Sequence, residues 1–159
     1  MTVSRDNSAG DKGKATAGSI SGTDITWGTP AVLRGLASLN HDVIKLTATT
    51  AIVMFDEAVT NALTARVITC SGTGGRTISL GDHVAFDGDC EFLSFAPLSE
   101  TKVVACYMDG GNSAYGTVCV LDIDGTTISA GTPTVFNSSQ TTYIHCSELN
   151  ESNLIALFR

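Results

Sequence analysis

Short apolar runs that each follow a polar turn recur at almost regular intervals along this chain. Residues 46–55, 98–107 and 149–158 align position by position, and their starting points lie 52 and 51 residues apart. Each segment holds a few polar residues followed by four or five apolar ones. A run of this length bounded by turn residues is typical of a β-strand that is buried on both faces. We therefore expect three equivalent buried strands.

A second phrase precedes each of these three segments. Residues 25–32 (ITWGTPAV) return as residues 78–85 (ISLGDHVA) and as residues 128–135 (ISAGTPTV), so that their glycines lie 53 and then 50 residues apart. A fixed period of about fifty residues built from short strands is the signature of a β-propeller or a related repeat array. The sequence therefore predicts an all-β repeat protein.

Four strands fit into each period. In the last full copy we expect them at residues 92–95, 103–107, 117–123 and 127–136. Asp124-Gly125 is a strong hairpin signal between the third and fourth strands. Pro30 and Pro133 mark the fourth strand as an edge, because proline cannot donate to a strand ladder. Four antiparallel strands that end at such an edge are typical of a propeller blade.

The two ends of the chain are out of phase with these blades. The expected segments are a flexible polar tail, an outer half-blade, two whole blades and an inner half-blade, at residues 1–13, 14–33, 41–86, 91–136 and 142–159. The propeller segment thus runs over residues 14–159 and amounts to three blades, whereas rings of four to eight blades are usual. We expect the half-blades of two copies to combine into split blades, which gives a homodimeric ring of six blades.

The sequence resembles a known class of repeats. The patterns LSETKVVACY (residues 98–107), DGGNS (109–113) and GTTISAGTP (125–133) resemble the roughly fifty-residue propeller repeats of marine phage and bacterial surface proteins. They resemble kelch and tachylectin-type propellers more distantly, since the Gly-Gly pairs at 74–75 and 110–111 stand at different places in the repeat. The resemblance covers residues 15–159 and implies a binding or structural module rather than an enzyme.

Composition narrows the classes of partner. The chain of 159 residues has a net charge of −7, and its nine lysines and arginines are scattered. Binding to a nucleic-acid backbone needs clustered cations, so we expect no nucleic-acid partner. No apolar stretch approaches eighteen residues and the first fourteen residues are polar, which predicts neither membrane insertion nor a signal peptide.

The five cysteines occupy different places in the repeat and include no C-x-x-C pair. Most stand in apolar, strand-like surroundings, which favours small buried side chains over a disulfide framework or a zinc site. His41, His83 and His145 also fall at different phases, so a shared metal site is not expected. Residues 72–76 look like a phosphate cradle, but no lysine or helix follows them. We interpret them as an expansion of the hairpin turn that reads Asp124-Gly125 in the next repeat.

Candidate ligand contacts lie in polar turns and on single side chains. The turns at residues 56–57, 109–112 and 137–140 are expected to be exposed, as recognition loops on a rigid scaffold usually are. The candidate residues are Asp109, Gly111, Asn112, Trp27 and His145. Trp27 is interpreted either as a sugar-stacking platform or as a filler of the seam between subunits. His145 is either a residue that lines a central channel or an ordinary hydrogen-bonded histidine.

These observations lead to two hypotheses of function. The first is a non-enzymatic, self-assembling module without cofactor or metal, which binds carbohydrate and serves attachment on a virion or cell surface. The alternative is a purely structural scaffold component that docks onto a larger assembly, such as a phage particle, through residues 1–13. No arrangement of nucleophile, base or metal ligands favours an enzyme.

Overall fold

The computed structural model describes residues 2–6 and 12–159, and it confirms the all-β class. The strands are β1 (Thr2–Asp6), β2 (Lys12–Thr16), β3 (Gly18–Ser21), β4 (Asp24–Trp27), β5 (Ala31–Lys45), β6 (Thr50–Glu57), β7 (Ala62–Ser71), β8 (Thr77–Gly88), β9 (Cys90–Ser99), β10 (Lys102–Asp109), β11 (Tyr115–Asp124), β12 (Thr127–Ala130), β13 (Thr134–Gln140), β14 (His145–Asn150) and β15 (Asn153–Leu157). Two 3-10 turns, η2 (Thr73–Gly75) and η3 (Gly110–Asn112), follow β7 and β10. Within the described residues no helix has the length and apolar character needed to cross a membrane.

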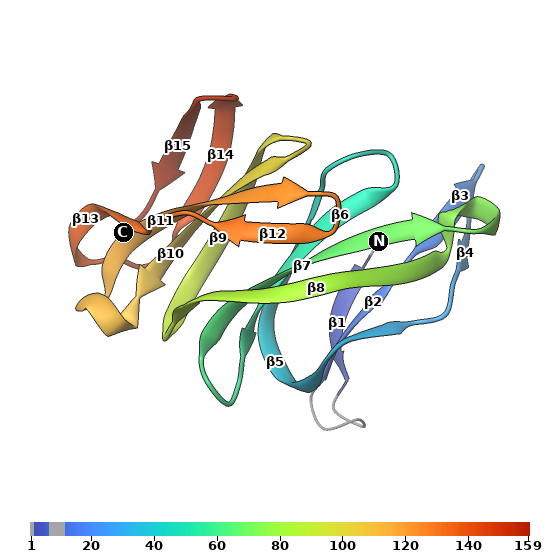
Figure 1. Cartoon of the computed structure of the whole chain (residues 1–159), viewed down its shortest axis with the longest axis horizontal. Coiled ribbons are helices and arrows are strands. Elements are labelled where there is room, and N and C mark those ends of the chain that lie inside the picture. The colour runs from blue at the N-terminus through green and yellow to red at the C-terminus, as the bar shows by residue number, and fades with distance from the viewer. Residues whose placement is uncertain (1, 7–11) are drawn as a thin grey trace.

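The strands are organised as four antiparallel layers that succeed one another along the long axis of the molecule (Figure 1). The N-terminal layer holds β1 to β4 and the beginning of β5. The first central layer runs from β5 to β8 and the second from β9 to β13, while β14 and β15 form the C-terminal hairpin. The long strand β5 belongs to two layers, because it pairs with β2 at its start and with β6 further on.

The strands β6 and β10 are buried on both faces, which confirms the expectation for residues 46–55 and 98–107. Val53 and Phe55 of β6 pack in a cluster with the N-terminal layer, whereas Ile52 and Met54 pack with the second central layer. Alternate residues of β10 likewise divide between a cluster with the first central layer and a cluster with the C-terminal hairpin. Each central layer is therefore enclosed between two neighbours.

The third strand that we expected to be buried, β15, is covered on one face only. Leu154 and Ala156 of β15 pack against the second central layer, but Ile155 and Leu157 on the other face are exposed. The reason is positional, since no further layer among the described residues follows the C-terminal hairpin.

The repeated glycine is explained by contact between layers. A Cβ atom on Gly28 would lie 2.0 Å from the backbone oxygen of Arg76, in the first central layer. A Cβ atom on Gly81 would lie 2.7 Å from the backbone oxygen of Thr126, in the second. Arg76 and Thr126 both directly precede the fourth strand of their layer. The repeat thus requires glycine where the next layer's hairpin approaches the backbone.

The outer hairpins share one geometry. Ser21 pairs with Asp24 and Asp124 with Thr127, so that both turns have two residues with a glycine at φ near +60°. In the first central layer Ser71 pairs with Thr77, which leaves residues 72–76 as the turn. The interpretation of this segment as an expanded hairpin is confirmed.

The start of the chain differs from the expected tail. Residues 2–6 form β1, which pairs with β2 from Thr2 opposite Thr16 to Asp6 opposite Lys12, while residues 1 and 7–11 lie outside the described residues. The pairing of Ala105 with Cys119 and of Asp109 with Tyr115 in β10 and β11 has the same register, 103 residues later. Strand β1 therefore corresponds to the second half of β10, which is the second strand of its repeat.

This strand changes the picture of the split blade. The predicted split blade needs a free strand edge on the outer half-blade, and β1 of the same chain pairs with part of that edge, at residues 12–16. The edge of β3 has no strand partner besides β4 among the described strands, so the combination of half-blades from two copies stays a prediction.

The cysteines agree with the sequence-based interpretation. All five are free thiols, and Cys90, Cys106, Cys119 and Cys146 are buried. They pack in the apolar clusters between layers, where they act as small hydrophobic side chains.

Candidate binding site at the inner-strand bulges

A left-handed backbone conformation recurs at one equivalent position of the repeat, within β5, within β9 and just before β14. Asn40, Phe92 and Tyr143 have φ angles of 48°, 50° and 53°, and they are 52 and 51 residues apart. Such angles cost a non-glycine residue on the order of 1–3 kcal/mol and gather at functional sites. The strand pairing of Asn40 and Phe92 is interrupted by bulges, which re-aim side chains. The repeat therefore stores strain at one equivalent position.

The bulges border a groove between the first and second central layers. Its volume is about 580 Å³, and its lining residues are Asn40, His41, Asp42, Glu91, Phe92 and Leu93. The rings of Phe92 and Tyr143 lie 5.5 Å apart between centroids, so that the aromatic surface continues toward the C-terminal hairpin. The groove combines an amide, carboxylates and an aromatic face.

Asp56 lies behind Asn40 at the end of β6. Asn40 Nδ2 donates a hydrogen bond of 2.5 Å to Asp56 Oδ2, and Asp56 is only 6% exposed. Its other oxygen, Oδ1, is buried without a hydrogen-bond partner in the part of the chain that the structure describes. Burial raises the pKa of Asp56 from 3.8 to about 6; the bond from Asn40 opposes this shift and the charge of Glu91 adds to it.

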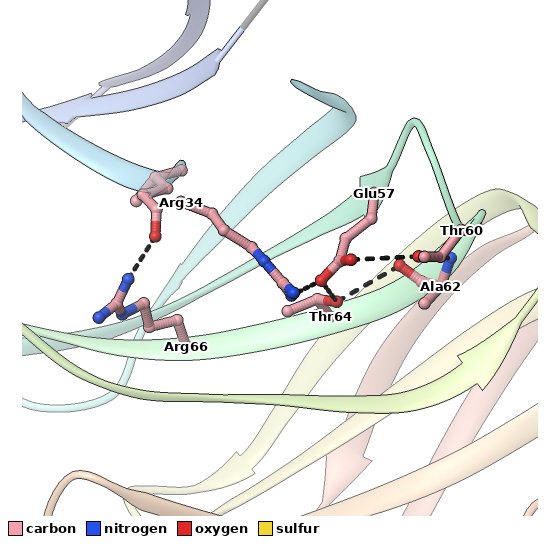
Figure 2. A network of polar contacts seen from close by, with 7 residues as sticks. Arg34, Glu57, Thr60, Ala62, Thr64 and Arg66 are labelled. Carbon is pink, nitrogen blue, oxygen red and sulfur yellow. Dashed lines mark hydrogen bonds and ion pairs between the residues drawn. The ribbon is translucent and has the colours of Figure 1, made fainter. Parts of the chain in front are cut away.

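The end of β6 is held by a polar network (Figure 2). The buried Glu57 pairs with Arg34 of β5 and accepts hydrogen bonds from Thr60 and Thr64, at 3.1 and 2.9 Å. Arg66 donates to the backbone oxygens of Leu33 and Gly81 and so ties β5 to β8. Because Asp56 directly precedes Glu57, this network fixes the position from which Asp56 orients Asn40.

His41 stands at the other side of the bulge. Its Nε2 lies 2.8 Å from the hydroxyl of Ser38, which also accepts a hydrogen bond from the backbone of Gly13. The ring of His41 packs 6.0 Å from that of Phe55, between centroids. The histidine thus links the groove to the N-terminal layer.

The arrangement suits ligands that carry several hydroxyl groups. Carboxylates accept hydrogen bonds and an amide both donates and accepts, which matches the neighbouring hydroxyls of a sugar. An aromatic face covers the apolar side of such a ring. The six lining residues include carboxylates but neither lysine nor arginine, so the groove does not favour anions.

The structure places the sequence-predicted residues elsewhere. Asp109, Gly111 and Asn112 lie together on the turn η3, where Asp109 Oδ1 accepts a hydrogen bond of 3.0 Å from the backbone of Asn112. Burial and the charge of Asp87 raise the pKa of Asp109. This side chain caps its own turn, as a structural residue does.

Trp27 is separated from that turn, and His145 lies on a different strand, β14. Figure 1 shows β4 and the turn between β10 and β11 toward opposite ends of the molecule. Trp27 borders a second groove of about 670 Å³, together with Arg76, Thr73 and Thr77 of the expanded hairpin. His145 Nδ1 lies 3.5 Å from the hydroxyl of Ser94 on β9. The five predicted residues therefore do not form one site.

Sequence reasoning missed the residues of the bulge groove. The turn at residues 56–57 was expected to be exposed, but Asp56 and Glu57 are buried. The three equivalent left-handed positions carry Asn40, Phe92 and Tyr143, of which only the last two share an aromatic side chain, so no residue type marks the position in all three repeats. Only a structural alignment of the repeats reveals their common φ angle.

Comparisons with protein families, with curated proteins and with solved structures found no match for this chain. Among the described residues no group of three or more histidine, cysteine or acidic side chains is arranged to hold a metal ion.

Proposed function

We propose that this protein is a non-enzymatic binding module of the β-propeller type, which recognises hydroxyl-rich ligands, glycans in particular, in the groove at Asn40 and Phe92. The observation that carries the proposal is a left-handed backbone conformation at three equivalent positions, two of which, Asn40 and Phe92, lie in strand bulges and line one groove. Strain at a repeated position is retained when function requires it.

The propeller part of the proposal is supported by the repeat itself. Two central layers of antiparallel strands pack face to face with equivalent neighbours, and the inner strands β5, β9 and β14 each follow the outer strand of the preceding repeat. In a propeller these inner strands surround the central channel, where the bulge groove would open.

A glycan array tests the ligand class, and calorimetry on the best binder tests the site. We expect Asn40→Ala and Phe92→Ala each to weaken binding about tenfold or more, which corresponds to about 1.4 kcal/mol. Asn112→Ala is the matched control, since this exposed residue lies on the turn η3 outside the groove. Loss of binding in Asn112→Ala with intact binding in the other two variants would contradict the assignment.

A scaffold role is the second candidate, and the exposed apolar faces of the two terminal layers favour it. If no glycan on the array binds and the purified chain assembles, the result would support the scaffold role instead of the binding module.

A further inference from the structure

The C-terminal hairpin exposes an apolar face. Leu149, Ile155 and Leu157 are 65%, 48% and 64% exposed, and we refer to them as the C-terminal face. Large exposed apolar patches mark sites of interaction in soluble proteins. The repeat shows what covers this face elsewhere in the chain.

The equivalent residues of the first central layer are buried between layers. Leu46, Ile52 and Met54 occupy the same positions one hundred and three residues earlier, and they are 8%, 1% and 1% exposed. They belong to the cluster that joins the first central layer to the second. A face of this kind is thus built to receive the next layer of the repeat.

The N-terminal layer exposes the complementary half. Ile20 and Ile25 are cross-strand partners, 74% and 52% exposed, and we refer to them with Trp27 as the N-terminal face. A Cβ atom on Gly18 would approach both the Trp27 ring and the Ile25 side chain, at 2.8 and 3.3 Å, which places these two residues on one face.

The equivalent cross-strand pair of the second central layer is buried. Ile123 and Ile128 are each 6% exposed and lie in the cluster with Leu46, Ile52 and Met54. The C-terminal face and the N-terminal face therefore correspond to the two sides of the interface between the central layers. They lie on the two terminal layers of the chain, where both are exposed.

We propose that the C-terminal face of one copy packs on the N-terminal face of a second copy and reproduces the interface between the two central layers. The contact joins two apolar faces, as the contact between the two central layers does. Two such contacts, related by a two-fold axis, close a symmetric dimer. The proposal does not depend on the ligand of the bulge groove.

Complementation between two variants tests this proposal. Ile25→Asp blocks the N-terminal face and Leu157→Asp blocks the C-terminal face, while both sites are exposed and outside the core. We expect the unmodified chain to have twice the monomer mass of 16.5 kDa in sedimentation, and each variant alone to remain at 16.5 kDa. An equimolar mixture of the two variants should regain the doubled mass, because one intact interface can still form.

Val59→Asp is the matched control, since Val59 is an apolar residue that is 73% exposed and lies on the turn between β6 and β7. This variant should assemble as the unmodified chain does. Circular dichroism verifies that every variant is folded.

Three results would overturn the proposal. One is a monomeric unmodified chain at the highest concentration used. Another is a dimer of either single variant, which would indicate a contact between like faces. The third is a mixture that stays monomeric although the unmodified chain is dimeric, because the two faces then do not bind each other.

Discussion

The buried carboxylate of Asp56 lowers the stability of the folded protein, but it also holds the Asn40 side chain in place. One of the carboxylate oxygens has no partner among the described residues, and the pKa of Asp56 is raised to about 6. The hydrogen bond from Asn40 offsets only part of the desolvation. Residues that are unfavourable for stability and favourable for a site are a common feature of functional regions.

The stability of the protein should therefore depend on pH through Asp56. The folded state binds a proton more tightly than the unfolded state, so stability falls as pH rises from about 4 to about 6. Above about pH 6, the buried charge of Asp56 lowers the free energy of unfolding by about 3 kcal/mol, which corresponds to the shift of its pKa from 3.8 to about 6. We expect Asp56→Asn to raise the free energy of unfolding at pH 7 by up to this amount and to change it little at pH 4.

Urea denaturation at both pH values measures this effect. Asp122→Asn is the control, since Asp122 is exposed in a surface ion pair with Lys102 and should matter by less than about 1 kcal/mol. Equal or lower stability of Asp56→Asn at pH 7 would contradict the account of the buried carboxylate.

At the scale of the elements, the repeat is defined by how strands of one layer meet hairpins of the next. Gly28 and Gly81 admit the backbone of Arg76 and Thr126, and no side chain fits at these contacts. The glycine of the recurring phrase is thus required by the close packing between layers. It occurs once in each of the first three layers, which accounts for its regular spacing along the chain.

A substitution at this contact should loosen the N-terminal layer. Gly28→Ala places a Cβ atom against the backbone of Arg76 and should destabilise the fold by about 1–3 kcal/mol, as overpacking does. Gly35→Ala is the control, because nothing lies within 4 Å of a Cβ atom there, and this variant should be neutral or slightly more stable. Equal unfolding free energies of the two variants would show that the contact is not formed.

The sequence predicts some of these elements and conceals others. The apolar runs of β6 and β10 are readable because both of their faces are buried. The strand β1 is not readable, since Thr2–Asp6 holds a single apolar residue, Val3, and only its register with β2 reveals it. The bulge groove also escapes sequence reasoning, because Asn40 and Phe92 share a φ angle and no chemistry.

At the scale of the whole molecule, four layers follow one another (Figure 1), and within residues 2–6 and 12–159 the two central layers are the ones covered on both faces. The terminal layers carry the two halves of an interface that the central layers form within the chain. Such repeat proteins gain stability from contacts between neighbouring units, so a terminal layer is the weakest part until something stacks on it. The central claim is therefore that each terminal layer is one unit of the repeat, whose exposed face is covered by a layer of a second copy.

Hydrogen exchange followed at low and high protein concentration tests this claim most directly. We expect the amides of β6 and β10 to be strongly protected at both concentrations, because these strands lie in covered layers. The amides of β15 and of β3 and β4 should exchange quickly in dilute solution and slow down together as copies stack. Protection of β15 equal to that of β10 in the dilute monomer, or rapid exchange in β6, would contradict the account.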